Sequence, residues 1–337
     1  MIKKLSASSV SSFYGCQMKW FLEYILGYRT ESGRAAAIGT MAHYVMEGVA
    51  KSKKLRQDNK KWRKDPIFGR IKQSYDLDEW ADAIFDHNTK VENHIEWSIK
   101  DRKLLKKYIN TAKNHRLFPE NHKEIIETEQ RFSLPINKPW AKYLNEQGKL
   151  EPIKINGFID LIYRDSKDNL HYVDYKFGGK RGDIPTDFHT GKDKTFSTMK
   201  QDIQLCLYYW AIRQLFPNMQ PITNIWYVNY NVVLTDAFED EIYKFTMDYV
   251  KKTLDQIKDM DSPTFLYNGG PLWKCNYLCS FSKQTFSDFD RPELTMNASG
   301  SEKFDSIGGK KCVCDTMKTF FNNRSLNSIV ENCKNVK

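Results

Sequence analysis

Two short apolar stretches determine how the middle of this chain folds: GFIDLI at residues 157–162 and YVDYKF at residues 172–177. Both are rich in the β-branched and aromatic residues that are typical of strands. Between them, residues 164–169 read RDSKDN, a polar cluster of the kind that makes a turn. The pattern predicts a β-hairpin that carries charged residues among apolar neighbours.

The register of this hairpin controls whether its charged residues meet. Asp174 and Lys176 point to the same face, because side chains alternate along a strand. A turn centred near Lys167 places Asp160 directly opposite Asp174, with the two Cβ atoms roughly 5 Å apart. A register shifted by one residue would send Asp160 to the opposite face.

Two carboxylates that face each other within apolar strands are costly to bury unless a positive group lies between them. A hard divalent cation such as Mg²⁺ meets this need, since it binds carboxylate, water and phosphate oxygens. Such an ion polarises a phosphoryl oxygen and lowers the pKa of a bound water, which Lys176 could orient or deprotonate. Lys176 could also neutralise the charge of the transition state. The two aspartates and the lysine are the residues that a phosphodiester hydrolase needs. The alternative for Asp174 and Lys176 is an exposed ion pair of little energetic value.

The hairpin belongs to an α/β core that follows a helical region and precedes an irregular tail. Residues 1–122 form the helical region, with one helix expected between Ser8 and Gly27. Residues 123–262 form the core, and residues 263–337 form an irregular, cysteine-containing tail. The core is expected to contain strands at residues 127–134, 154–163, 170–177 and 222–233, and helices at residues 198–216 and 237–260.

The charge of the chain is moderately positive and unevenly spread. Its 337 residues hold 52 Lys and Arg against 42 Asp and Glu, a formal net charge of +10. Residues 51–64 contain eight basic residues and one acid, Asp58. Such a run fits a solvated surface as well as a path for a phosphate backbone, with Trp62 available to stack on unpaired bases.

No stretch of the sequence predicts a membrane span or an export signal. The apolar runs fall short of the roughly 18 residues that a membrane span needs, and no apolar segment follows the charged start of the chain. The seven cysteines are an odd number, and four of them form two close pairs near the C-terminus. A cytoplasmic, reducing compartment is therefore expected, where clustered cysteines indicate a metal or catalysis before disulfides.

Five short motifs occur in a characteristic order along the chain. LSASS at residues 5–9 leads to Cys16, and it is followed by GTMAH (39–43), GFID (157–160), DYK (174–176) and QLCLY (204–208). In this order and spacing the set resembles the PD-(D/E)XK nuclease superfamily, specifically its RecB-like exonuclease branch, from residue 5 to about residue 280. The resemblance implies a restriction-endonuclease-like core, in which helices flank a mixed central sheet.

The resemblance also implies roles for individual residues. The groups that would bind Mg²⁺ or Mn²⁺ are His43, Asp160, Asp174 and the main-chain carbonyl of Tyr175. Lys176 would be the catalytic lysine. Gln204 and Tyr208 lie one helical turn apart and would support Lys176 and the DNA strand, and Glu129 would be a carboxylate behind the metal ligands.

Several of these residues also have a purely structural interpretation. His43 could form a helix-surface pair with Glu47, four residues further on. Gln204 could be an ordinary polar residue on an amphipathic helix. Glu127 has the same parity as Glu129 along its strand, so either of them could face the site.

The cysteines are candidates for a second site. Some members of the RecB-like branch hold a [4Fe-4S] cluster, with one cysteine from the N-terminal helix and three from the tail. The resemblance therefore implies that the tail, residues 263–337, packs back on the first helix. The candidate ligands are Cys16, Cys275, Cys279 and either Cys312 or Cys314. The spacing departs from the family, because three residues instead of two separate the first tail pair and about thirty precede the next cysteine. Zinc or ordinary thiols are the alternatives, and Cys206 and Cys333 are expected to be structural.

The function expected from all of these features is that of a divalent-metal-dependent deoxyribonuclease, in particular an exonuclease, in DNA recombination, repair or mobile-element DNA processing. One alternative is a non-catalytic or partner-dependent DNA-binding subunit of the same fold, which would need a broken site. Another is an enzyme that acts on RNA. The sequence has no GxxxxGK(S/T) loop, so a helicase or recombination protein would be a separate partner.

Overall fold

The structure is a computed structural model that describes residues 2–25, 33–60, 76–145, 147–178 and 195–260, with the backbone alone at 28–29, 180–181, 184–185 and 295–296. The chain divides into two compact units. The sheet unit comprises Ser32–Leu134 and Ile155–Thr246, and the terminal unit comprises Met1–Glu31, Pro135–Lys154 and Met247–Lys337. The expected domain limits at residues 122 and 262 stay predictions.

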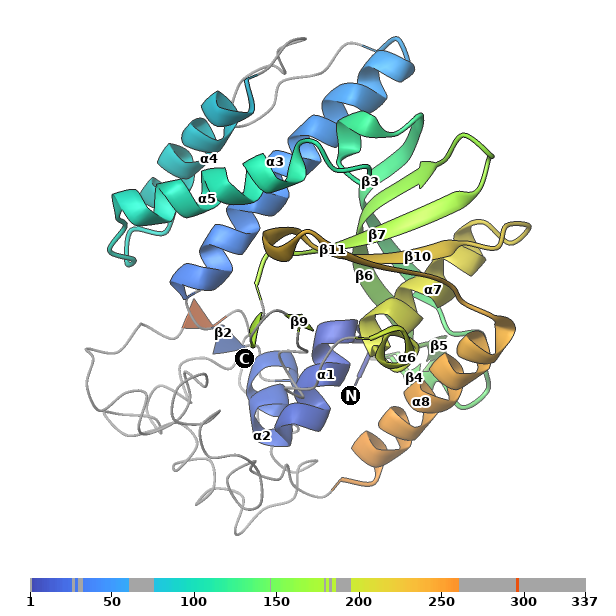
Figure 1. The fold of residues 1–337 in the computed structure, drawn as a ribbon. Coiled ribbons are helices and arrows are strands. Elements are labelled where there is room, and N and C mark those ends of the chain that lie inside the picture. Colours follow the sequence, from blue (N-terminus) through green and yellow to red (C-terminus); the bar gives the residue numbers. More distant parts are fainter. Residues whose placement is uncertain are drawn as a thin grey trace. The chain divides into compact units, whose positions relative to one another are not determined.

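A mixed β-sheet forms the centre of the sheet unit (Figure 1). Its strands are β3 (Glu124–Pro135), β6 (Lys154–Arg164), β7 (Leu170–Lys176), β10 (Ile222–Tyr227) and β11 (Val232–Ala237). They lie in the order β6-β7-β10-β11, and β3 also pairs with β6. Strands β7 and β10 are parallel, while the β6–β7 and β10–β11 pairs are antiparallel. The mixed central sheet expected from the sequence is confirmed.

The β6–β7 hairpin has the register that the turn residues predict. Leu161 lies opposite Val173, and the pairing continues in step to a turn centred at Lys167. One step beyond this pair, the same register brings Asp160 opposite Asp174. The two carboxylates are therefore brought to the open end of the hairpin together.

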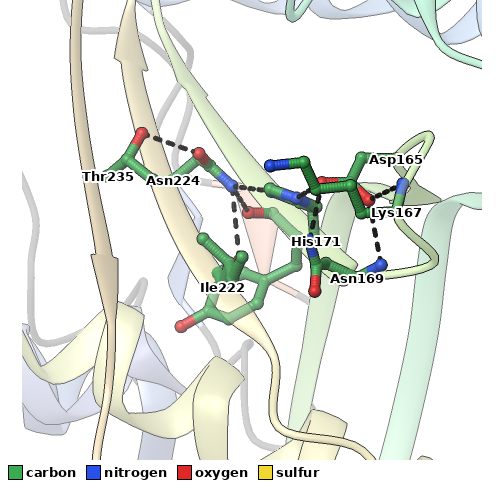
Figure 2. Close-up of polar contacts among 8 residues, drawn as sticks. Asp165, Lys167, Asn169, His171, Ile222, Asn224 and Thr235 are labelled. Atoms are coloured by element: carbon green, nitrogen blue, oxygen red, sulfur yellow. Dashed lines mark hydrogen bonds and ion pairs between the residues drawn. The ribbon is translucent and has the colours of Figure 1, made fainter.

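Side-chain hydrogen bonds hold the turn end of the hairpin (Figure 2). Asp165 accepts hydrogen bonds from the main-chain N–H groups of Lys167 and Asn169, at 2.8 and 2.9 Å. Asp165 also contacts His171 Nε2 at 3.2 Å, and the Nδ1 atom of the same ring lies 3.3 Å from the amide nitrogen of Asn224 on β10. This network joins the turn to the next strand of the sheet and stabilises the register.

Helices cover both faces of the sheet (Figure 1). The helical elements of this unit are α3 (Arg34–Gln57), α4 (Leu77–Val91), α5 (Ile99–Ala112), η2 (Pro119–Asn121), α6 (Phe196–Met199), α7 (Ile203–Leu215) and η3 (Val228–Tyr230), with a small β8 (Lys180–Arg181) and β9 (Ile184–Pro185) pair. Helices α3, α4 and α5 share an apolar core with Val173 and Tyr175. On the other face, Tyr172 Oη donates to the carbonyl of Leu205 on α7 at 2.9 Å.

Polar residues start three of these helices and explain where they begin. Asp76 accepts hydrogen bonds from the first turn of α4, and Ser98 begins α5 through a capping box. Asp202 accepts hydrogen bonds from the first turn of α7. Because Asp202 has an extended backbone, the single helix expected over residues 198–216 is wrong, and the segment forms α6 and α7 instead.

The single strand expected over residues 222–233 is also wrong, since the segment reverses direction. β10 ends at Tyr227, and η3 follows as a short 3-10 turn. Asn231 then adopts a left-handed backbone with φ of 54°, a conformation that asparagine tolerates well. The chain returns as β11, antiparallel to β10.

The terminal unit contains shorter elements. They are β1 (Lys4–Leu5), α1 (Ala7–Gly15), α2 (Gln17–Trp20), the π-helical η1 (Phe21–Ile25), β2 (Tyr28–Arg29), β4 (Lys142–Leu144), β5 (Leu150–Pro152) and β12 (Thr295–Met296). Helix α8 (Asp240–Lys258) runs from the sheet unit into this unit. Within the terminal unit, Tyr14 Oη of α1 lies 3.1 Å from Thr253 Oγ1 of α8.

The single helix expected between Ser8 and Gly27 is interrupted at Cys16. Helix α1 begins earlier than expected, with Ser6 as its cap. Cys16 has an extended backbone, with φ of −165° and ψ of 110°, which ends α1. Its Sγ atom then accepts a hydrogen bond from the N–H of Lys19 at 3.5 Å and so begins α2. In the part of the chain that the structure describes, every helix is too short or too polar to cross a lipid bilayer.

Candidate active site

Two buried aspartates lie at the open end of the β6–β7 hairpin. Asp160 and Asp174 are 9% and 2% exposed. Asp160 Oδ2 accepts a hydrogen bond of 2.6 Å from the main-chain N–H of Tyr175, and its carbonyl accepts one of 3.2 Å from Thr128 Oγ1 on β3. The Asp160 side chain is thus held at the point where three strands come together.

Asp174 is part of a hydrogen-bonded set with Lys176 and helix α7. Lys176 Nζ lies 2.7 Å from Asp174 Oδ2 and donates to Gln204 Oε1 at 2.9 Å. Gln204 Nε2 lies 2.9 Å from both Asp174 Oδ1 and the hydroxyl oxygen of Tyr208. Gln204 therefore fixes the positions of the aspartate and the lysine at the same time. The side chain of Lys176 is partly exposed, with 33% of its surface accessible to solvent.

His43 on α3 and Glu129 on β3 complete the cluster. His43 Nδ1 lies 3.7 Å from Asp160 Oδ2. Ligand atoms of His43, Glu129 and Asp160 all lie within 4.8 Å of one another. The imidazole packs edge-on against the ring of Phe177, with 5.0 Å between the two ring centroids. The side chain of His43 remains 32% exposed. Glu47 forms an ion pair with Lys51, which leaves the imidazole of His43 facing the aspartate.

An unusual backbone conformation accompanies the position of Glu129. Its φ of 47° is in the left-handed region, which is uncommon for a residue other than glycine and interrupts the regular alternation of β3. Glu127, its competitor in the sequence, lies outside the cluster and accepts the N–H of Thr128 through Oε1 at 3.2 Å. Glu129 is therefore the β3 carboxylate that joins the site.

The charges in this cluster are poorly balanced by the protein alone. Burial, followed by repulsion from Asp160, raises the pKa of Glu129 to about 7. Burial and then the charge of Asp174 raise the pKa of Asp160 well above its usual value. Burial also lowers the pKa of His43, so its imidazole is neutral and can act as a ligand. A neutral imidazole with crowded, buried carboxylates is a donor set that suits a divalent cation.

The family of the chain follows from this geometry together with its sequence match. A family model described as the PD-(D/E)XK nuclease superfamily matches residues 4–284. The chain belongs to this superfamily. The family and the restriction-endonuclease-like fold predicted from the motifs are confirmed.

This PD-(D/E)XK protein spans only a small part of the length of the curated relatives that it matches. Three proteins of Streptococcus agalactiae, from serotypes Ia, V and III, are each named as a subunit of an ATP-dependent helicase/deoxyribonuclease and are 26% identical over 184 residues. The alignment covers 54% of this chain and 15% of each relative. A solved structure of a candidate exonuclease from Eubacterium rectale is 12% identical, with a TM-score of 0.47, and the match covers 87% of this chain and 91% of the other.

The structure brings most of the predicted site residues of this PD-(D/E)XK protein together. His43, Asp160 and Glu129 converge, and Asp174 touches Lys176 and Gln204 beside them. The Tyr175 side chain lies in the core that α3, α4 and α5 share with the sheet. Its carbonyl and the carboxylate of Asp174 stay predicted as metal ligands.

The predicted cysteine site falls largely outside the described residues. Cys275, Cys279, Cys312 and Cys314 lie there, as do Cys333 and Trp62. Cys16 is described in the terminal unit, where it caps α2. Cys206 is fully buried on α7, as expected for a structural cysteine.

The glycine of the GFID motif has a structural explanation that the sequence does not provide. A Cβ atom on Gly157 would lie 2.6 Å from the ring of Phe132 and 3.2 Å from the ring of Tyr208. Only glycine lets β6 approach these two rings so closely. Gly157 therefore lets β6 pack against the ring of Tyr208, whose hydroxyl group contacts Gln204.

In the described part of the basic run, residues 51–60, several basic side chains form hydrogen bonds or ion pairs with other residues of the protein. Lys53 donates to the carbonyls of Glu120 and His122. Lys54 and Lys60 both pair with Asp58, at 3.3 and 3.2 Å. These contacts favour a structural role for this part of the run over a path for a phosphate backbone.

Proposed function

We propose that this protein is a divalent-metal-dependent deoxyribonuclease that hydrolyses phosphodiester bonds, in particular as an exonuclease. The observation that carries the proposal is the convergence of His43, Glu129 and Asp160 beside the Asp174–Lys176 pair. Membership of the PD-(D/E)XK nuclease superfamily supports the same chemistry.

The residues divide into a cation site and a set that supports the lysine. His43, Glu129 and Asp160 would hold a Mg²⁺ or Mn²⁺ ion, with Asp174 next to them. Such an ion supplies Lewis acidity toward a phosphoryl oxygen and lowers the pKa of water. Gln204 keeps Lys176 against Asp174, and Tyr208 holds the amide of Gln204 from the next turn of α7.

Lys176 contributes charge in this proposal. Burial alone would lower the pKa of its ammonium group, but the carboxylate of Asp174, together with those of Asp160 and Asp202, offsets burial, so the pKa is raised. The protonated lysine can neutralise a phosphate oxygen or orient a water through hydrogen bonds. This favours charge neutralisation over proton abstraction, the other role considered for Lys176.

The substrate and the partner of the enzyme follow by analogy with its relatives. Those proteins are described as helicase/deoxyribonuclease subunits, which supports DNA as the substrate. We therefore propose that a separate helicase or recombination protein supplies DNA ends or single strands, in recombination, repair or mobile-element DNA processing. A location in the reducing cytoplasm rests on the cysteine pattern.

Digestion of end-labelled DNA tests this function. Single-stranded and double-stranded DNA, and a single-stranded RNA of the same sequence, are incubated with Mg²⁺, Mn²⁺ or EDTA. We expect cleavage of DNA with either metal, none with EDTA and none by Asp174→Ala. Cleavage of RNA alone would overturn the choice of DNA. DNA binding without cleavage under any condition would favour the non-catalytic alternative.

A further inference from the structure

An exposed aromatic side chain lies next to the candidate active site on β6. Phe158 comes two residues before Asp160, roughly 7 Å away along the strand, and it is 51% exposed. Its neighbours face the interior: Gly157 meets the rings of Phe132 and Tyr208, and Ile159 is fully buried. The ring of Phe158 therefore points away from the protein core and toward solvent.

An arginine on the neighbouring strand accompanies this ring. The Cζ atom of Arg131 lies 5.9 Å from the centroid of the Phe158 ring. Arg131 is exposed, and among the described residues it forms no ion pair with a carboxylate. Its guanidinium group is thus available to an anion that approaches the ring.

The arginine and the ring are displaced from the metal-site residues in the same direction. Contacts between β3 and β6 run from Thr128–Asp160 through Arg131–Phe158, so residue numbers rise along one strand as they fall along the other. Arg131 follows Glu129 by two residues on β3, and Phe158 precedes Asp160 by two residues on β6. The pair is therefore one short step along the sheet from the candidate cation site.

We propose that Phe158 and Arg131 form a stacking platform for an unpaired nucleotide of a single-stranded DNA substrate, next to the phosphate that reacts. This inference rests on the proposed function and names its substrate class. A base of any kind can stack on the phenyl ring, and the guanidinium group of Arg131 can contact the neighbouring phosphate. A base within a duplex has both of its faces covered by other bases, so the platform selects unpaired strands.

Binding of two matched oligonucleotides tests the platform. One is a fluorescein-labelled single-stranded 16-mer, and the other has the same length with abasic sites in place of its internal nucleotides. Fluorescence anisotropy is measured with Ca²⁺ as the only divalent ion, and strand integrity is checked on a gel. We expect Phe158→Ala to weaken binding of the normal strand about tenfold, the value of one stacked base, and to leave binding of the abasic strand unchanged.

Further variants separate stacking from folding and from charge. Phe158→Leu keeps an apolar side chain of similar size without a stacking face, so it should lose affinity like Phe158→Ala, while Phe158→Tyr should keep it. Phe245→Ala removes an exposed aromatic from α8 as the matched control and should bind like wild type. Arg131→Gln should weaken binding of both strands. It should also reduce the slope of log affinity against log salt concentration by roughly 1, because one phosphate contact is lost.

The outcomes distinguish this inference from the proposed function. Wild-type affinity in Phe158→Leu, or an equal loss on normal and abasic strands, would overturn the platform. A wild-type protein that cleaves duplex DNA but does not bind the single strand would also overturn it, and would leave the nuclease proposal standing. Base-dependent binding through Phe158 without cleavage under any metal would support the platform and overturn the nuclease.

Discussion

Glu129 owes its place in the cluster to one backbone angle. Its left-handed φ of 47° is a conformation that a residue other than glycine adopts only where the surroundings stabilise it. Its carboxylate is half-buried beside Asp160, and this combination raises its pKa to about 7. A bound cation would remove this electrostatic cost, which gives the residue a measurable role.

Glu129→Gln should weaken metal binding, because it removes a charge and preserves the shape of the side chain. We expect the Mn²⁺ affinity measured by isothermal titration calorimetry to fall by roughly tenfold or more. Glu127→Gln is the matched control on the same strand, and it should bind Mn²⁺ like wild type. An unchanged affinity in Glu129→Gln would remove this residue from the set of metal ligands.

The contrast between Asp160 and Glu129 shows how far single residues could be predicted. The position of Asp160 follows from the turn centred at Lys167, since polar turn residues and strand alternation set the register. The position of Glu129 depends on a left-handed residue that no glycine or asparagine marks. Strand parity therefore could not separate Glu129 from Glu127.

At the scale of elements, two glycines of α3 have opposite environments. A Cβ atom on Gly48 would lie 2.1 Å from the buried ring of Trp80 on α4, whereas one on Gly39 would meet nothing within 4 Å. We expect Gly48→Ala to lower the free energy of unfolding by about 1–3 kcal/mol through overpacking. Gly39→Ala should raise it by about 0.5–1 kcal/mol, because alanine favours a helix.

Urea denaturation followed by circular dichroism measures both changes in the same helix. Each variant is the control for the other, since the substitution and the secondary structure are identical. Stabilisation by both variants would show that α4 does not pack against Gly48 as described.

Acid should destabilise the contact between the loop before β3 and strand β6. His122 Nε2 donates to the carbonyl of Leu117 at 3.2 Å, and its ring stacks on Tyr163 at 3.8 Å. Burial lowers the pKa of His122 to about 3. Below pH 6.5 the unfolded chain binds a proton that the folded chain does not, so stability is complete above this pH and is lost as the pH falls toward 3.

Because of His122, the free energy of unfolding should fall by about 1.4 kcal/mol between pH 7.5 and pH 5.5. Urea denaturation at both values should give this decrease in wild type, and a smaller decrease in His122→Gln, whose amide can still donate to Leu117. The same pH dependence in both proteins would contradict a buried, neutral His122.

Predictions at the element scale succeeded where polar residues mark both ends and failed where the chain bends within an apolar run. The hairpin strands were predicted closely because a charged turn separates them. The breaks at Asp202 and Asn231 were missed, since each lies inside a stretch whose apolar pattern continues on both sides. Propensity alone does not show which of several polar residues ends an element.

At the scale of the whole molecule, the order of the motifs identified the family although each motif alone is weak. The predicted span began at residue 5, and the family match covers residues 4–284. The division into two units was not predictable, because the terminal unit combines three segments that are far apart in the sequence. Such contacts leave no local pattern.

The cysteines allow a prediction for the entire chain. Protein purified without oxygen should contain iron, as measured by elemental analysis, and Cys16→Ser and Cys275→Ser should both lose it and melt at a lower temperature. Cys206→Ala is the control, because the Cys206 side chain is buried on α7, and it should keep the metal. Zinc in place of iron would favour the alternative cofactor, and unchanged metal content in both serine variants would exclude a site formed by these cysteines.

The most direct measurement is metal-dependent cleavage of end-labelled single-stranded DNA by wild type and by Lys176→Ala, with thermal melting of both proteins. Lys176 touches Asp174 and Gln204 and has a partly exposed side chain, so its loss should abolish reaction and leave the fold intact. We expect cleavage by wild type with Mg²⁺, none with EDTA, and none by a folded Lys176→Ala that still binds DNA. Equal cleavage by a folded Lys176→Ala and wild type would contradict this assignment of the active site.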